Sequence, residues 1–124
     1  MARISKAKRE EEKIKAIEQH HQYLEKIFET KDEKRRLLIL SLIDEASFMY
    51  VTLKDLKQQI NRDGIKEKYK NGSNQWGYKD STEVKTYNTM IKNYTSVIKQ
   101  LNDIIPTAKK INPEDEFDSF NNLK

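Results

Sequence analysis

The sequence predicts a mainly α-helical (all-α) protein, built on a long antiparallel helical hairpin with a basic helix before it and a small β-hairpin or loop inserted in it. Glycine and proline are absent between Arg3 and Arg62, which favours long helices. Apolar residues recur at steps of three and four, the helical period. Of the 124 residues, 35% are hydrophobic and 35% are charged. This hydrophobic content is barely enough to fill the core of a compact globule of this length. We therefore expect either that part of the chain is unfolded or that the helices complete their core in a cyclic oligomer.

The N-terminal segment, residues 1–31, predicts a charged helix over about 5–30 with a narrow apolar seam. His21 occupies the one seam position, between Ile17 and Leu24, that lacks an aliphatic side chain. Such a stripe is typical of a coiled-coil-like helix. Thr30-Lys31-Asp32 then offers a break and a new N-cap. The seam residues are Ala7, Ile14, Ile17, Leu24 and Phe28.

A second helix is predicted from about Glu33 to Arg62, with a length of about 45 Å at 1.5 Å per residue. Gly64 is a plausible C-terminal stop. Its seam alternates steps of three and four without a miss, through Ile39, Leu42, Ala46, Met49, Leu53, Leu56 and Ile60. The apolar surface is widened beyond the seam by Leu37, Leu38, Ile43, Phe48 and Val51.

Residues 64–80 change character, because charged and apolar residues alternate from Ile65 to Lys70 and Asn71-Gly72 follows. Asn-Gly is the preferred pair of a type I′ hairpin turn. We therefore predict a small β-hairpin, with a structured loop as the alternative.

A third helix is predicted to begin at Asp80-Ser81, where either residue can cap and Glu83 can reach back, and to end before Pro106. Its seam again steps by three and four, through Val84, Tyr87, Ile91, Tyr94, Ile98, Leu101 and Ile105. The second and third helices are expected to pair within an oligomerisation core of residues 32–110. The tail, residues 111–124, has four acidic residues and one lysine, a net charge of −3, and is expected to be disordered.

The residues offer little for catalysis. The chain has no cysteine, which excludes disulfides, thiolate zinc sites and cysteine nucleophiles. His20-His21 is the only histidine cluster, and we interpret it as surface or seam histidines rather than metal ligands. Asp44-Glu45 follows an apolar run like a Walker B pair, but no Gly-Lys-Ser/Thr loop exists. We therefore expect no enzyme and no cofactor.

No apolar run approaches the roughly 18 residues of a membrane span, and the N-terminus lacks the hydrophobic stretch of a secretory signal. We therefore expect a soluble, intracellular protein without a membrane partner. Its formal net charge is +4.

Two basic clusters are candidate nucleic-acid contacts. Four cationic side chains precede the first acid, Glu10, and fit either a phosphate-contacting arm or a solvated helix end. On the predicted β-hairpin, lysines surround Tyr69, Trp76 and Tyr78, as in proteins that hold a nucleic-acid backbone and stack on bases. We favour the more common arrangement, in which such a hairpin packs onto its own helices. The hairpin lysines are Lys66, Lys68, Lys70 and Lys79.

Residues 35–106 resemble the small terminase subunit of tailed bacteriophages and prophages of Gram-positive hosts. The resemblance is carried by residues 42–53, by Asn-Gly-x-Asn-Gln-x-Gly at 71–77, and by Tyr-Asn-Thr-Met-Ile-Lys-Asn-Tyr at 87–94, followed by residues 97–101. It implies a non-enzymatic packaging factor in the host cytoplasm. Such proteins form rings, engage the viral genome on double-stranded DNA, and recruit or regulate a large subunit that holds the ATPase and nuclease.

One departure concerns DNA, because many small terminases carry an N-terminal helix-turn-helix and none is evident here. We assign the DNA contact from charge to Arg3, Lys6, Lys8, Arg9, Lys13 and Lys15. Oligomerisation is assigned to Ile39, Leu42, Met49, Leu53, Leu56, Tyr87, Ile91, Tyr94 and Ile98. Docking on the large subunit is assigned to Glu114, Asp115, Glu116, Phe117 and Phe120. The alternative function is a helical adaptor or scaffold with only non-specific DNA affinity.

Overall fold

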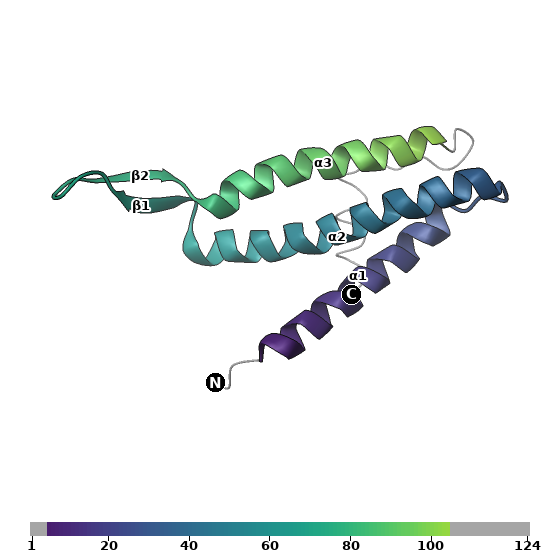
Figure 1. The fold of residues 1–124 in the computed structure, drawn as a ribbon, viewed down its shortest axis with the longest axis horizontal. Helices are drawn as coiled ribbons and strands as arrows, with labels where there is room; N and C mark the ends of the chain where they lie inside the picture. The colour runs from purple at the N-terminus through teal and green to yellow at the C-terminus, as the bar shows by residue number, and fades with distance from the viewer. Residues whose placement is uncertain (1–4, 105–124) are drawn as a thin grey trace.

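The computed structural model describes residues 5–104. The elements follow in the order α1 (Lys6–Ile27), α2 (Glu33–Asp63), β1 (Lys66–Lys70), β2 (Trp76–Asp80) and α3 (Thr82–Ile104). Helices α2 and α3 lie side by side and antiparallel, and the two strands project beyond one end of the pair (Figure 1). The predicted mainly helical fold with a small β-hairpin is confirmed for these residues.

The helix boundaries follow from their caps. Asp32 accepts hydrogen bonds from the backbone N–H groups at the start of α2, at 3.0 and 3.3 Å. Gly64 ends α2 with a φ of +87°, a conformation that glycine adopts without a steric cost. Ser81 Oγ accepts from the N–H of Val84 at 3.1 Å, so Ser81 is the residue that caps α3. Asp80 is instead held by Lys66 Nζ at 2.7 Å.

The seams of α2 and α3 meet inside a single chain. Ile43, Ala46 and Leu53 of α2 and Ile98 and Leu101 of α3 are fully buried, and α2 and α3 belong to one hydrophobic core. The predicted pairing of the second and third helices thus buries, within one chain, seam side chains that the sequence assigned to oligomerisation. The antiparallel pairing of the two helices satisfies them locally.

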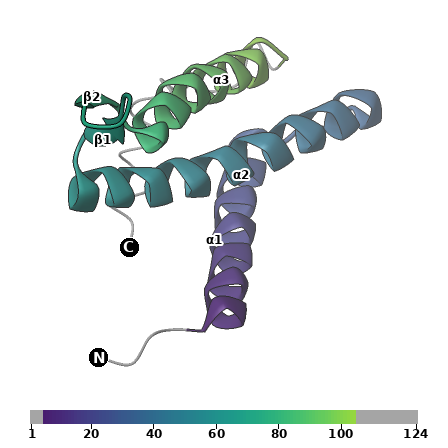
Figure 2. The ribbon, with the colours of Figure 1, turned by 60° about the vertical axis from the view of Figure 1, so that its left-hand side comes forward.

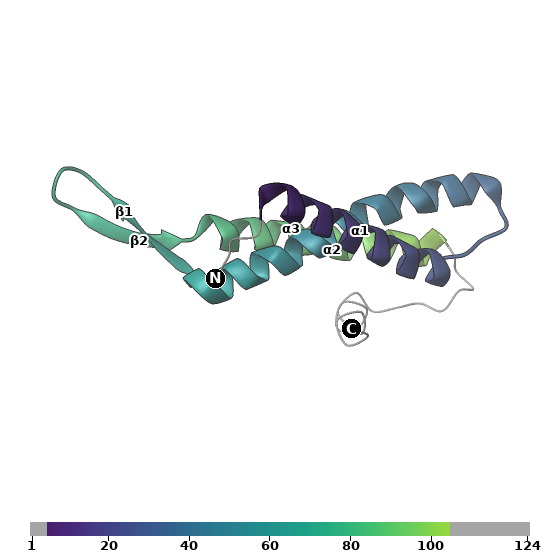
Figure 3. The ribbon, with the colours of Figure 1, turned by 90° about the horizontal axis from the view of Figure 1, so that it is seen from below.

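Helix α1 crosses α2 and adds to the same core (Figures 2 and 3). Leu24 and Phe28 are buried there, as the predicted seam requires, whereas Ile14 is 57% exposed. The seam histidine is His20, which is fully buried, and the prediction that His21 fills this position is wrong. Both residues fit a step of three or four from Ile17, and the crossing of α1 over α2 selects the step of three.

The two strands pair antiparallel, with Lys70 opposite Trp76. Five residues, 71–75, therefore form the loop, and the Asn71 N–H donates to the Gln75 carbonyl at 2.7 Å. The predicted type I′ turn at Asn71-Gly72 is wrong, because such a turn needs positive φ at both residues. Among residues 5–104 only Gly64 and Gly72 have positive φ.

The β-hairpin continues along the long axis of the α2–α3 pair instead of folding back (Figures 1 and 3). Trp76 is 58% exposed and Tyr78 is 72% exposed. The expectation that these aromatic side chains pack onto the protein's own helices is therefore wrong. The hairpin joins two neighbouring helix ends through very short connections, so it leaves the helical pair end-on.

Candidate nucleic-acid interface

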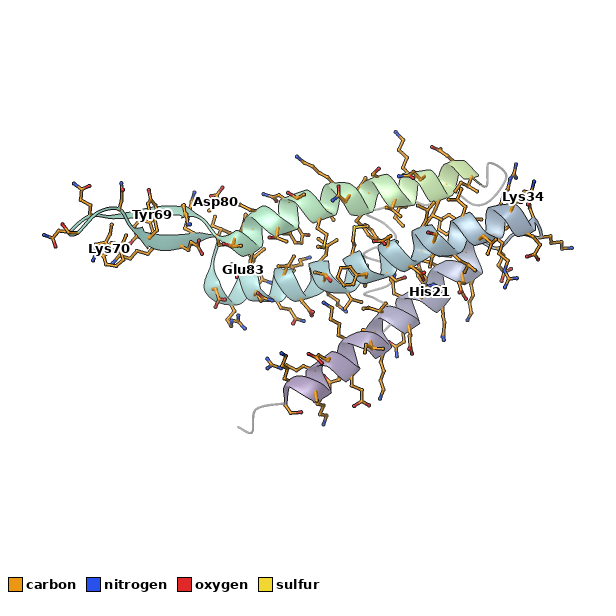
Figure 4. The ribbon with its side chains drawn as sticks, in the orientation of Figure 1. His21, Lys34, Tyr69, Lys70, Asp80 and Glu83 are labelled. Atoms are coloured by element: carbon orange, nitrogen blue, oxygen red, sulfur yellow. The ribbon has the colours of Figure 1, made fainter. Side chains whose placement is uncertain are left out.

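The strand register sorts the hairpin side chains into two faces, because successive residues of a strand point to opposite sides. Cross-strand partners share a face, and the pairs are Lys66 with Asp80, Lys68 with Tyr78 and Lys70 with Trp76. We call these six residues the lysine face. The other face consists of Glu67, Tyr69, Gly77 and Lys79. Figure 4 shows Tyr69 and Lys70 on the hairpin, away from all three helices.

The face opposite the lysine face is closed by its own contacts. A Cβ added at Gly77 would stand 3.0 Å from Tyr69 Cζ, so the glycine lets the tyrosine ring lie across the neighbouring strand. Lys79 Nζ lies 3.3 Å from Glu67 Oε1 and 5.7 Å from the centre of the Tyr69 ring. Lys79, the one lysine of this face, is thus paired with a carboxylate.

On the lysine face, the lysine at the base of the hairpin is the one with a carboxylate partner in the described part of the chain. Lys66 Nζ lies 2.7 Å from Asp80 Oδ1, and this hydrogen bond lowers the pKa of the Asp80 carboxyl group. Within residues 5–104 no carboxylate oxygen lies within 4.0 Å of Lys68 or Lys70 Nζ. The two ammonium groups therefore have their charge available to an external anion.

Trp76 lies close to both of these ammonium groups. Lys68 Nζ lies 4.7 Å from the centre of the Trp76 ring, and Lys70 Nζ lies 5.9 Å from it. A lysine over an indole face is attracted by the ring quadrupole. One side chain of β2 thus holds two cations of β1 above the surface of the hairpin.

Helix α1 divides the basic residues that the sequence grouped as one DNA-binding arm. Lys6, Arg9 and Lys13 line a groove of about 760 Å³ between α1 and α2. Lys8 and Lys15 are seven residues apart, about two helical turns, and Lys15 Nζ lies 3.6 Å from Glu11. Arg3 lies outside the described residues. The basic residues of α1 therefore do not form one continuous patch.

The groove beside α1 is mixed in charge. Its basic residues on α2 are Lys54 and Arg62, and its acidic residues are Glu10, Glu12 and Asp55. Lys13 Nζ lies 5.1 Å from the centre of the Phe48 ring, so this lysine covers an apolar side chain of α2.

The predicted oligomerisation residues fall into two groups. Buried residues of the core are Ile39, Met49, Leu53, Tyr94 and Ile98. Leu42, Tyr87 and Ile91 are partly exposed and pack against that core, and Leu56 is also partly exposed. The apolar side chains of α2 that face solvent are instead Leu37, Leu38 and Phe48, at 71%, 52% and 47% exposed. The sequence marks all three as apolar residues outside the seam, but it marks Ile43 and Val51 in the same way, and these two are buried. The seam pattern alone therefore does not identify the exposed residues.

The tail assigned to large-subunit docking, which includes Glu114, Asp115, Glu116, Phe117 and Phe120, lies outside the described residues.

The histidines are engaged by protein groups. His21 Nδ1 lies 2.9 Å from Glu25 Oε1, and His21 Nε2 lies 2.6 Å from Asp44 Oδ1. In the described part of the chain no three histidine and carboxylate side chains are grouped as metal ligands. Within that same range no helix is both long and apolar enough to cross a membrane.

No protein-family model, no curated protein and no solved structure matches the chain. Among residues 5–104, the feature that bears on function is the lysine face of the hairpin.

Proposed function

We propose that the protein is a small terminase subunit, a non-enzymatic factor that binds viral double-stranded DNA and recruits and regulates a large ATPase–nuclease subunit during genome packaging. The observation that carries the DNA-binding part is the pair Lys68 and Lys70, which project from the hairpin with no carboxylate partner among residues 5–104. The resemblance of residues 35–106 supports the packaging role, because a duplex-binding helical protein is what that role needs.

Ring assembly is part of this proposal, and the exposed apolar residues of α2 support it. Leu37 and Leu38 are adjacent, and each exposes more than half of its surface, at 71% and 52%. Single exposed leucines are ordinary on a protein surface, but two neighbours on a long helix present a contact for a second copy. A cyclic oligomer would cover this position on every subunit.

Recruitment of the large subunit is assigned to the acidic tail, residues 111–124. Deleting these residues should leave assembly unchanged and abolish stimulation of the large subunit's ATPase. Unchanged stimulation would remove the tail from the proposal while leaving DNA binding intact.

The decisive experiment measures duplex DNA binding and ATPase stimulation with the full-length protein. At about 150 mM salt, where the Debye length is about 8 Å, we expect the protein to retain binding to a duplex that carries the packaging start. It should also raise the ATPase rate of the cognate large subunit. The competing function is a helical adaptor or scaffold, which would use the exposed Leu37–Leu38 pair to bind another protein instead of a second copy. Loss of all DNA binding at this salt, together with an unchanged ATPase rate, would establish the adaptor instead.

A further inference from the structure

We infer that the lysine face of the hairpin, rather than α1, is the principal DNA contact, and that the hairpin lies as a two-stranded ribbon in the major groove with Lys68 and Lys70 against phosphates. This inference rests on the proposed function, because it names the surface by which a packaging factor holds the duplex. It differs from the sequence-based assignment, which placed the contact on the N-terminal helix.

The position of the hairpin permits this contact. The two strands extend beyond the end of α2 and α3, and none of the helices described within residues 5–104 lies beside them (Figures 1 and 3). The major groove of B-DNA is about 12 Å wide and accepts a two-stranded β-ribbon. A ribbon that leaves the helical pair end-on can therefore enter the groove without a clash between DNA and the helices.

The charge of the hairpin is also placed for DNA. The lysine face carries three lysines and one carboxylate, Asp80, and that carboxylate is taken by Lys66 at 2.7 Å. Lys68 and Lys70 stand two residues apart on the same side of β1, about 6.6 Å along the strand at 3.3 Å per residue. This spacing lets the two ammonium groups reach separate phosphates.

Trp76 favours duplex over single-stranded nucleic acid as the ligand. Single-strand binding uses aromatic rings on which unstacked bases lie. Here Lys68 and Lys70 stand over the Trp76 ring at 4.7 and 5.9 Å. The Trp76 ring is therefore already engaged by the protein's own cations. The role of the Trp76 ring is to position those lysines, whose ammonium groups are suited to binding a phosphate backbone.

Helix α1 is the weaker candidate for a physical reason. Lys6, Arg9 and Lys13 share their groove with two cations of α2, Lys54 and Arg62, and with three carboxylates, those of Glu10, Glu12 and Asp55. Arg62 is itself paired with Asp63 at 2.8 Å. A phosphate that approached this groove would meet carboxylates as well as cations, and the repulsion offsets part of the attraction.

The test replaces the two available lysines with glutamine, in the double variant Lys68→Gln/Lys70→Gln of the full-length protein. The matched control is Lys92→Gln/Lys99→Gln, which removes the same charge from exposed positions of α3. Binding to a fluorescent duplex of about 40 base pairs is followed by anisotropy at several salt concentrations. Each lost phosphate contact reduces the magnitude of the slope of log K against log salt by about 0.9. The slope of the hairpin variant should therefore be smaller in magnitude by about 1.8 than that of the wild-type protein, and the slope of the control should change much less.

Several results would overturn the inference. The first is a hairpin variant whose salt slope equals that of the wild-type protein. The second is a control variant whose salt slope falls as much as that of the hairpin variant. The third is a larger fall of the salt slope in Lys6→Gln/Arg9→Gln than in the hairpin variant. Tighter binding to a single strand than to the duplex would identify a different ligand, as would equal competition by polyglutamate. The variant Lys68→Arg/Lys70→Arg should keep the slope, and far-UV circular dichroism checks that every variant keeps its helices.

The proposed function fails by a different result from the one that overturns this inference. If the wild-type protein itself does not bind duplex DNA at about 150 mM salt, the packaging role is wrong. If the wild-type protein binds and the hairpin variant binds with the same slope, only the placement of the contact is wrong.

Discussion

The imidazole ring of His20 lies stacked on the phenol ring of Tyr50, with ring centroids 4.0 Å apart and 11° between the planes. His20 is fully buried, and its Nδ1 lies 3.4 Å from Ser47 Oγ. The Tyr94 ring of α3 lies 6.5 Å from the same imidazole. One side chain of α1 thus touches both α2 and the aromatic surface of α3, and this contact helps to fasten α1 to the helical pair.

Replacing this histidine should destabilise the protein far more than replacing its neighbour. His20→Ala leaves a cavity under Tyr50 and should cost about 2–4 kcal/mol of unfolding free energy, as other buried ring truncations do. His21→Ala removes only the contacts with Glu25 and Asp44 near the surface and should cost less than about 1 kcal/mol. Urea unfolding followed by circular dichroism measures both. Equal losses in the two variants would contradict the placement of His20 in the core.

Stability and assembly should respond to different apolar residues of α2. Leu53 is fully buried in the single chain, so Leu53→Ala should lower the unfolding free energy by about 2–5 kcal/mol. Leu37→Ser/Leu38→Ser removes exposed apolar groups and should leave the stability of the subunit within about 0.5 kcal/mol of wild type. Light scattering should show that this double variant falls from a ring to the 14.7 kDa mass of one chain. A wild-type protein that already has the mass of one chain would contradict assembly through these leucines.

The base of the hairpin should open in acid. The hydrogen bond from Lys66 lowers the pKa of Asp80 below its ordinary value of 3.8. The pKa of Asp80 is lower in the folded hairpin than in the unfolded chain. The Lys66–Asp80 pair therefore stabilises the hairpin fully at pH values above the ordinary pKa of Asp80. This stabilisation is lost as the pH falls through the lowered pKa of the folded hairpin. Trp76 fluorescence, recorded between about pH 5 and about pH 2, should report the loss of the hairpin environment.

The variant Asp80→Asn provides the control for this acid transition. Already at neutral pH, the Trp76 fluorescence of Asp80→Asn should be shifted part of the way toward the value that the wild-type protein reaches only in acid. An identical acid transition in Asp80→Asn would assign the change to other carboxylates.

Trp76 should affect DNA affinity without changing the salt dependence. In Trp76→Ala both lysines keep their charge but lose the ring that positions them, an attraction worth about 0.5–1 kcal/mol at an exposed site. Affinity for duplex DNA should therefore fall about two- to fivefold, with an unchanged salt slope, and Trp76→Phe should recover most of it. A loss much larger than fivefold, seen on single-stranded DNA, would indicate base stacking on the ring.

The helix limits were predictable because they depend on local chemistry. Asp32 is predicted as a cap and caps α2, and Gly64 is predicted as a stop and ends it. The pairing of α2 with α3 follows from two seams of matching period separated by a short insertion. The β-hairpin itself follows from the alternation between Ile65 and Lys70, since residues two apart share one face of a strand.

The errors arise where two local solutions are equally good. His20 and His21 both satisfy a helical step from Ile17, and only the crossing of α1 over α2 decides which one is buried. The Asn71-Gly72 pair suits a two-residue turn, but the register that places Lys70 opposite Trp76 requires five loop residues. Seam periodicity likewise identifies Leu53 as a contact residue without saying whether its partner belongs to the same chain.

The amino-acid sequence by itself determined the helices, their caps and the inserted hairpin, since these depend on residues within a few positions of one another. Tertiary structure alone decided which residues act together at a distance. It buried His20 rather than His21, divided the basic residues of α1 between a mixed-charge groove and solvent, and sent the hairpin out beyond the helices. Which lysines lack a carboxylate partner among residues 5–104, as Lys68 and Lys70 do, depends on strand register and on the direction in which the hairpin leaves the helices. The periodicity of the sequence predicts neither the strand register nor the direction of the hairpin.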